Sequence, residues 1–230
     1  YVHMHAAKHI GLWRRVRRSF ETNHRPVFSV GGGPLLCLLG WCFDTPWAGR
    51  LTAVEPMNWS PVTSNADWDK ARQLLCGHIT EESAFVPGPT VPGQLCPLGV
   101  QRALPPEELP DEAVVLLPYV VNHLMNERHL SPDAANEMAA WVSRAVYARR
   151  ATVVIADMPP AKLDLWTPLL RALELEHLVV ESLKYSEDCA GLKDLYSHPT
   201  DQNFRCGVNF PHMCQTTVLV MNQSHPMFLT

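Results

Sequence analysis

The chain has 230 residues, of which 47% are hydrophobic and 18% are charged, and its formal net charge at pH 7 is −4. These values are typical of a folded domain with a large core, and they exclude an intrinsically disordered chain. The negative charge excludes a global positive field that would attract nucleic acid. The longest apolar runs, 34–43 and 113–121, reach about half of the roughly 18–20 residues that a membrane span needs, so we expect no membrane segment.

The cysteines form an odd set without the regular spacing of a disulfide framework or a zinc site. No C-x-x-C pair occurs in the sequence, and we therefore predict no metal site. We expect an intracellular protein, cytoplasmic or nuclear, with an organelle and a removed targeting segment left open because the chain begins at Tyr1. The cysteines are Cys37, Cys42, Cys76, Cys96, Cys189, Cys206 and Cys214.

Apolar residues recur at helical spacing near the start of the chain and predict a helix over residues 1–22. We interpret residues 1–25 as a helical extension and residues 26–230 as the main domain. The arginines of the segment Arg14–Arg18 fall mostly on other faces of this helix. They are either a docking surface for a protein or RNA partner or a solvated helix face. The apolar residues are Ile10, Trp13, Val16 and Phe20.

A β-branched strand, 27–30, runs into three glycines, Gly31–Gly33, and then into an apolar helix, 35–43. This is the opening of a nucleotide-binding α/β unit, in which glycine allows the backbone to turn sharply and to approach a ligand. A second short strand, 51–54, is followed by Glu55, which stands 24 positions after Gly31. An acid at this spacing can accept hydrogen bonds from both hydroxyls of a ribose.

Met57 and Trp59 follow the acid, and they either pack against an adenine ring or cover the edge of the sheet. A helix is expected over 67–76. A weak third strand is expected over 98–101, and a buried strand over 113–117, where a continuous aliphatic run indicates that both faces are covered. The proline-rich stretch 87–110, which surrounds this weak strand, is otherwise expected to be irregular.

The second half continues the alternation of strands and helices. Ser131-Pro132-Asp133 opens a helix with a capping serine and a proline in the first turn. A strand over 151–156 ends in Asp157–Pro160, which we interpret as a rigid loop. A helix over 165–173 and strands over 177–184 and 216–221 complete the chain. This alternation predicts an α/β fold with helices on both faces of a mostly parallel sheet.

This order of elements resembles the class I S-adenosylmethionine-dependent methyltransferases over roughly residues 26–221. The matching features are the turn Gly31-Gly-Gly-Pro34, the acid Glu55 and the strand end at Pro118-Tyr119. The resemblance implies a Rossmann-like seven-stranded, mostly parallel sheet with an antiparallel edge strand. The sequence departs from the family pattern at Ser29, where an acid usually helps to hold the amino-acid end of the cofactor, and at Leu35, where a glycine is usual.

The resemblance implies transfer of a methyl group from S-adenosylmethionine to an acceptor. The helix that carries Arg14–Arg18 and the proline-rich stretch 87–110 offer docking surfaces and favour a macromolecular acceptor, RNA or protein. The alternative is a catalytically inactive, methyltransferase-like subunit that acts as a binding or scaffold module. His123 is either a general base or a surface histidine beside a capped helix start. The implied cofactor-binding residues are Gly31, Gly32, Gly33, Pro34, Glu55, Met57, Gln101, Arg102 and Pro118, and the implied acceptor-side, catalytic residues are Tyr119, Asn122 and His123.

Overall fold

The computed structural model describes residues 2–20, 24–31, 36–43, 47–55, 84–87, 100–101, 104–118, 132–157, 167–176, 178–188 and 213–223. The strands are β1 (Val27–Val30), β2 (Leu51–Glu55), β3 (Ala84–Pro87), β4 (Val114–Pro118), β5 (Thr152–Asp157), β6 (Val179–Asp188) and β7 (Met213–Asn222). The helices are α1 (Val2–Arg17), α2 (Leu36–Cys42), α6 (Pro132–Arg149), α7 (Thr167–Leu175) and a short 3-10 helix, η2 (Pro106–Glu108). None of the helices in these residues is long and apolar enough to cross a membrane.

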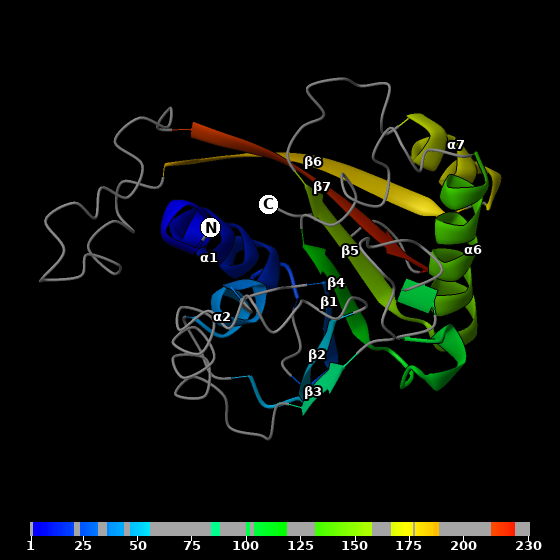
Figure 1. Cartoon of the computed structure of the whole chain (residues 1–230), viewed down its shortest axis with the longest axis horizontal. Helices are drawn as coiled ribbons and strands as arrows, with labels where there is room; N and C mark the ends of the chain where they lie inside the picture. Colours follow the sequence, from blue (N-terminus) through cyan, green and yellow to red (C-terminus); the bar gives the residue numbers. More distant parts are fainter. Residues whose placement is uncertain are drawn as a thin grey trace, which may run out of the picture.

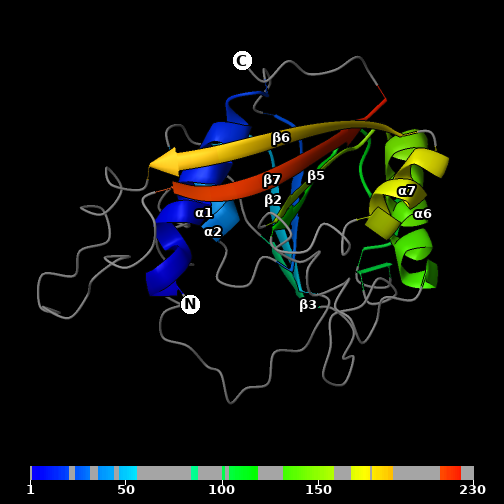
Figure 2. The same ribbon diagram turned by 90° about the horizontal axis from the view of Figure 1, so that it is seen from above.

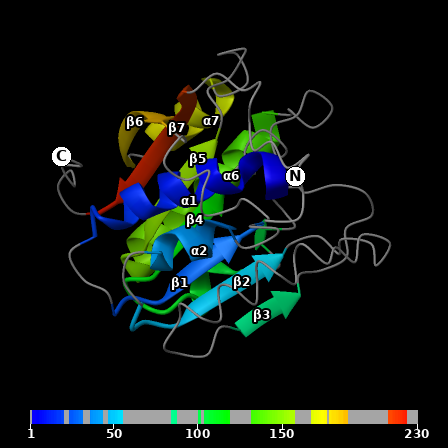
Figure 3. The same cartoon turned by 90° about the vertical axis from the view of Figure 1, so that its left-hand side faces the viewer.

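The strands form one mixed sheet in the order β3-β2-β1-β4-β5-β7-β6 (Figure 1). β1 pairs in parallel with both β2 and β4, β2 with β3, and β4 with β5, whereas β7 is antiparallel to both of its neighbours. Figure 3 shows β1, β2 and β3 side by side with their carboxyl ends at the same edge. The predicted α/β fold with a mixed sheet and helices is therefore confirmed.

Helices cover both faces of the sheet, with α1 and α2 on one side and α6 and α7 on the other (Figures 1 and 2). Alternate strand residues enter the two hydrophobic clusters. On β4, Val115 and Leu117 belong to the cluster under α6 and α7, while Val114 and Leu116 belong to the cluster under α1 and α2. Each fully buried aliphatic side chain contributes about 1.5–3 kcal/mol of transfer free energy, so the central strands anchor the fold.

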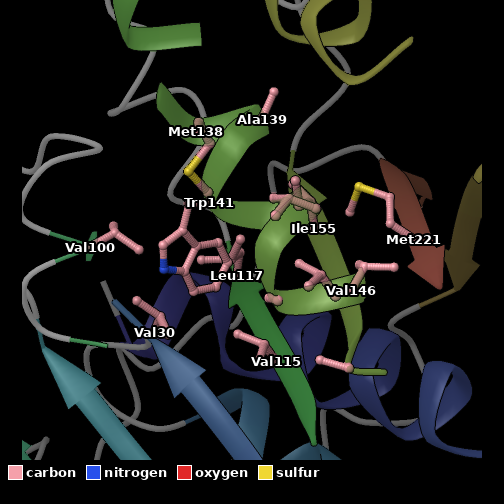
Figure 4. Close-up of a cluster of buried hydrophobic side chains, with 14 of the residues drawn as sticks. Val30, Val100, Val115, Leu117, Met138, Ala139, Trp141, Val146, Ile155 and Met221 are labelled. Carbon is pink, nitrogen blue, oxygen red and sulfur yellow. The ribbon is translucent and has the colours of Figure 1, made fainter. Parts of the chain in front are cut away.

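The cluster under α6 and α7 reaches the carboxyl ends of β1 and β2. It includes Val30 and Val54 together with the buried indole of Trp141 from α6 (Figure 4). The Trp141 indole N–H donates to the Leu104 carbonyl oxygen at 2.8 Å, which satisfies the polar atom of a buried ring. The core therefore supports the sheet edge at which we expect the ligand.

One prediction about the strands was wrong. Val100 and Gln101 are helical, and the strand that follows β2 in the sheet is Ala84–Pro87 instead of 98–101. Val100 is fully buried in the hydrophobic cluster that contains Val30, so its apolar character reflects core packing rather than strand pairing. The expected antiparallel edge is present, because the edge strand β6 pairs antiparallel with β7, which lies between β5 and β6. Insertion at this position gives β7 a hydrogen-bonded neighbour on each side.

The Arg25 side chain connects the starts of neighbouring strands at the amino edge of the sheet, which is the edge where the parallel strands begin. Its guanidinium donates to the carbonyl oxygens of Glu112 and Ala113 and, at 3.0 Å, to the Thr152 hydroxyl. These contacts join the segment before β1 to the starts of β4 and β5. The fixed amino edge holds the register of the three strands, which in turn determines where their carboxyl ends lie.

Helix α1 packs closely against α2. Ile10, Trp13 and Val16 are fully buried in the hydrophobic cluster on this face of the sheet. The division of the chain at residue 25 stays a prediction. Gly40 makes the approach possible, because a Cβ at this position would lie 2.7 Å from the Ile10 carbonyl oxygen and 2.8 Å from its Cα. These neighbours are backbone atoms and cannot rotate away.

We therefore expect Gly40→Ala to lower the free energy of unfolding by about 1–3 kcal/mol, although alanine has the higher helix propensity. Chemical denaturation would measure the loss. Asn136→Ala on the exposed side of α6 serves as the control and should change stability by less than about 0.5 kcal/mol. A Gly40→Ala variant as stable as the parent would contradict the close α1–α2 contact.

Candidate functional site

The glycine bend and the predicted ribose acid lie beside each other at the carboxyl edge of the sheet. Gly31 has a φ of 68°, a left-handed conformation that glycine adopts without strain. Its N–H donates at 2.8 Å to the carbonyl oxygen of Val54, the residue before Glu55. Because Val30 is in register with Val54, the chain leaves β1 next to the last residue of β2. The expected spatial relation of Gly31 and Glu55 thus holds for the backbone.

Ser29, which stands where the resembling family has an acid, is fully buried. Its hydroxyl oxygen lies 2.8 Å from the Cys37 sulfur, and either atom can donate the hydrogen bond. Cys37 is itself fully buried in the first turn of α2. The sequence showed that the acid was missing but gave no signal for the serine–cysteine contact that occupies its place.

The ends of β4 and β5 lie together further along the same edge. Pro118 is the last residue of β4, is buried, and is in register with Ala156 of β5. Asp157 follows Ala156 as the last residue of β5 and is only 2% exposed. Asp157 begins the predicted rigid loop, and its burial at the strand end makes it an additional candidate for a polar group at this edge of the sheet.

Gln101 is half-buried and helical, so it does not belong to the strand that the sequence predicted over 98–101. Its neighbour Val100 is buried in the same hydrophobic cluster as Val30 and Val54, which lie at or near the carboxyl ends of β1 and β2 (Figure 4). The Leu104 N–H donates to the Val100 carbonyl oxygen at 2.9 Å. Gln101 therefore follows a residue that belongs to the core on this face of the sheet.

The other predicted site residues lie outside the described residues, and for Glu55 the description covers the backbone. Their roles stay predictions. They are Gly32, Gly33, Pro34, Met57, Arg102, Tyr119, Asn122 and His123.

Two arginines of the segment Arg14–Arg18 stack on aromatic rings of their own chain. The Arg14 guanidinium carbon lies 5.3 Å from the centre of the Phe43 ring, and that of Arg17 lies 4.7 Å from the centre of the Trp47 ring. Such contacts stabilise the fold through cation–π attraction. Arg15 and Arg18 are exposed, whereas Arg14 and Arg17 are half-buried.

A groove of about 440 Å³ lies between α6 and α7. Leu175, which is 76% exposed, and the Arg171 side chain contribute to its lining. Its walls come from two helices instead of the strand ends at β1 and β2. We assign no ligand to it.

Cys42, at the end of α2, is not suited to nucleophilic chemistry. Burial raises the pKa of its thiol to about 12, although a hydrogen bond with the Trp47 backbone and the charge of Arg17 act in the opposite direction. The thiolate is the reactive form, and it is scarce at neutral pH when the pKa is this high.

We therefore expect Cys42 to resist iodoacetamide in the folded protein at pH 8, at least about 100-fold more strongly than in the unfolded chain. Peptide mapping by mass spectrometry after timed labelling would measure the two rates. Labelling of Cys42 at the same rate in both states would contradict its burial.

No protein-family model matches the sequence. A search of curated proteins also gave no match. Among solved structures, a cyclopropane-fatty-acyl-phospholipid synthase-like protein from Lactobacillus casei is 10% identical, with a TM-score of 0.52, and the match covers 95% of this chain and 92% of that one.

Two further structures match less closely. Precorrin-6y C5,15-methyltransferase from Geobacter metallireducens is 14% identical, with a TM-score of 0.49 and coverage of 92% and 86% of the two chains. The O-methyltransferase TomG from Streptomyces achromogenes, solved in complex with SAM, is 12% identical, with a TM-score of 0.43 and coverage of 94% and 79%. At 10% identity the first match shows the fold alone, and the chain shares the Rossmann-like fold of that protein.

Proposed function

We propose that the chain is an S-adenosylmethionine-dependent methyltransferase whose cofactor binds at the carboxyl ends of β1 and β2. One observation carries this proposal, namely the left-handed bend at Gly31 whose N–H is bonded to Val54 beside Glu55. Ligands of open α/β sheets bind in the crevice beyond the carboxyl ends of the strands. The bend leaves the backbone free to approach a ligand, and the neighbouring acid suits a ribose.

In this proposal, each group of residues binds a different part of the cofactor. The backbone of Gly31–Gly33 and Pro34 lies along its amino-acid end, and Glu55 accepts hydrogen bonds from the ribose hydroxyls. Met57, Gln101 and Arg102 contact the adenine, and Pro118 forms the floor at the end of β4. Val30, Val54 and Val100 are all buried in one hydrophobic cluster, which supports a common site for the segments that follow them.

Tyr119, Asn122 and His123 follow β4 and face the acceptor in this proposal. The cofactor would supply an activated methyl group on a sulfonium, from which the neutral thioether S-adenosylhomocysteine is a good leaving group. The protein has chiefly to align the acceptor with that methyl group and to exclude water. His123 removes a proton where the acceptor carries one, since its ordinary pKa lies near neutrality.

The ribose assignment predicts that Glu55→Gln weakens binding of S-adenosylhomocysteine by about 5- to 150-fold, because replacing an ionised hydrogen-bond acceptor by a neutral one costs about 1–3 kcal/mol in total. Isothermal titration calorimetry would measure the two dissociation constants. Glu112→Gln is the matched control, since Glu112 precedes β4 at the amino edge and should leave the affinity unchanged.

Equal affinities of the parent and Glu55→Gln proteins would refute the ribose assignment. A folded parent protein that binds neither S-adenosylmethionine nor S-adenosylhomocysteine would refute the proposed methyltransferase activity and would favour the inactive scaffold subunit.

The acceptor in this proposal is a macromolecule, either RNA or protein, that docks on the helix carrying Arg14–Arg18. The exposure of Arg15 and Arg18 supports such a surface. Basic side chains can contact phosphate groups or acidic segments of a partner.

We expect tritium from methyl-labelled S-adenosylmethionine to enter material of a cell extract that RNase or protease digests. Arg15→Glu combined with Arg18→Glu should lower this incorporation at least about 10-fold while leaving calorimetric binding of S-adenosylhomocysteine unchanged. Label that enters only compounds resistant to both digestions would contradict a macromolecular acceptor.

A further inference from the structure

Positive charge is concentrated in the first 50 residues of the chain. They contain seven lysines and arginines against two acids, whereas the remaining 180 residues contain twelve against 21. These first residues include α1 and α2, which lie together on one face of the sheet (Figure 3). Although the whole chain is negative, such an asymmetry creates a local positive field that attracts an anionic partner.

Contacts around the Trp47 indole bring the end of α1 to the amino edge of the sheet. The Arg17 guanidinium carbon lies 4.7 Å from the centre of the Trp47 ring, and the indole N–H donates at 2.8 Å to the Arg25 carbonyl oxygen. Gly49 packs against the same ring, because a Cβ there would lie 2.7 Å from the indole nitrogen and 2.7 Å from the His24 carbonyl oxygen. The end of α1 and the segments before β1 and β2 therefore form one junction.

Three exposed arginines surround this junction, namely Arg15, Arg18 and Arg50. Arg15 and Arg18 are three positions apart at the end of α1 and so lie on one side of it. Arg50 precedes β2, and its carbonyl oxygen accepts a hydrogen bond at 2.8 Å from the N–H of Val27, the first residue of β1. Arg50 forms no ion pair with any residue that the structure describes, whereas Arg150, further along the same edge, pairs with two acids at 3.5 Å.

The side chains of this surface favour a nucleic acid over a protein as the partner. Protein interfaces have an apolar, often aromatic centre that is poor in charge, whereas interfaces with nucleic acids are polar and strongly positive. In the part of the chain that the structure describes, the exposed large hydrophobic side chains are Tyr147 and Leu175, which lie on α6 and α7 at the other face of the sheet. The planar guanidinium group also matches the geometry of a phosphate.

We propose that Arg15, Arg18 and Arg50 form a phosphate-binding surface for RNA at the amino edge of the sheet. Contacts to phosphates carry the affinity, so binding depends little on base sequence. The surface is separate from the cofactor site proposed at the carboxyl edge and does not need methyl transfer. Only the choice of RNA over DNA rests on the proposed function, in which RNA is a possible acceptor.

Fluorescence anisotropy with a labelled oligouridylate of about 20 nucleotides tests the proposal, since sites for single strands span roughly 4–16 nucleotides. The logarithm of the association constant should fall with the logarithm of the KCl concentration with a slope of about −2, because each phosphate contact contributes about −0.7. Arg50→Gln should reduce this slope by about 0.7. The combined variant Arg15→Gln, Arg18→Gln and Arg50→Gln should bind at least about 10-fold more weakly at about 50 mM KCl.

Arg171→Gln is the matched control. Arg171 is also an exposed arginine, but it lies on α7 at the other face of the sheet, so its loss should leave the affinity and the slope unchanged. All of the substituted side chains are exposed, and thermal melting should show that each variant is as stable as the parent to within about 0.5 kcal/mol.

Lack of oligouridylate binding by the parent at about 50 mM KCl would overturn the proposal. An equal loss of affinity in Arg50→Gln and Arg171→Gln would do the same. Tighter binding of polyglutamate, of phosphatidylserine vesicles or of oligothymidylate DNA than of the RNA would assign the surface to an acidic protein, a membrane or DNA instead.

Calorimetry with S-adenosylhomocysteine distinguishes this failure from failure of the proposed function. If the parent binds S-adenosylhomocysteine but not the RNA, the cofactor site stands and the RNA surface is refuted. If the parent binds the RNA through these arginines but not S-adenosylhomocysteine, the surface stands and the proposed methyltransferase activity is refuted.

Discussion

The parallel pairing of β1 with β2 is the constraint on which the proposed site depends. Val27 to Val30 are in register with Leu51 to Val54, and the next N–H along β1, that of Gly31, still bonds to the Val54 carbonyl oxygen. A parallel pair brings two carboxyl ends to the same edge, so the residue after each strand faces the same space. A shift of β2 by one residue relative to β1 would move Glu55 away from the bend and exchange the two faces of the shifted strand.

The sequence predicts the central strands well because both of their faces are buried. The aliphatic runs within β4 and β5 contain no polar residue that would expose one face, and short continuous apolar runs of this kind are typical of parallel strands between two helix layers. The opening of α6 was equally readable, since Pro132 and Asp133 occupy a first turn that favours proline and an acid. In these segments local preference and tertiary packing agree.

The elements that the sequence placed wrongly are those in which packing decides. Ala84–Pro87 is only four residues long and ends in a proline, which weakens the strand signal. Periodicity cannot separate a short buried strand from a buried helical turn, and Val100 is buried as part of a helix. The position of β7 also cannot be read locally. Its insertion between β5 and β6 depends on hydrogen bonds to a strand more than fifty residues earlier in the chain.

For the site, the sequence indicates which residue types follow each strand but not which side chains already have partners. Ser29 shows this difference most clearly, because a serine in an apolar strand could equally face a ligand or a neighbouring helix. Its contact with Cys37 satisfies a buried hydroxyl without placing a charge in the core, and an isolated buried carboxylate there would be costly. A buried acid at this position would need a compensating charge or hydrogen-bond donors. The neutral Ser29–Cys37 pair therefore stabilises the packing of β1 against α2 without a bound ligand.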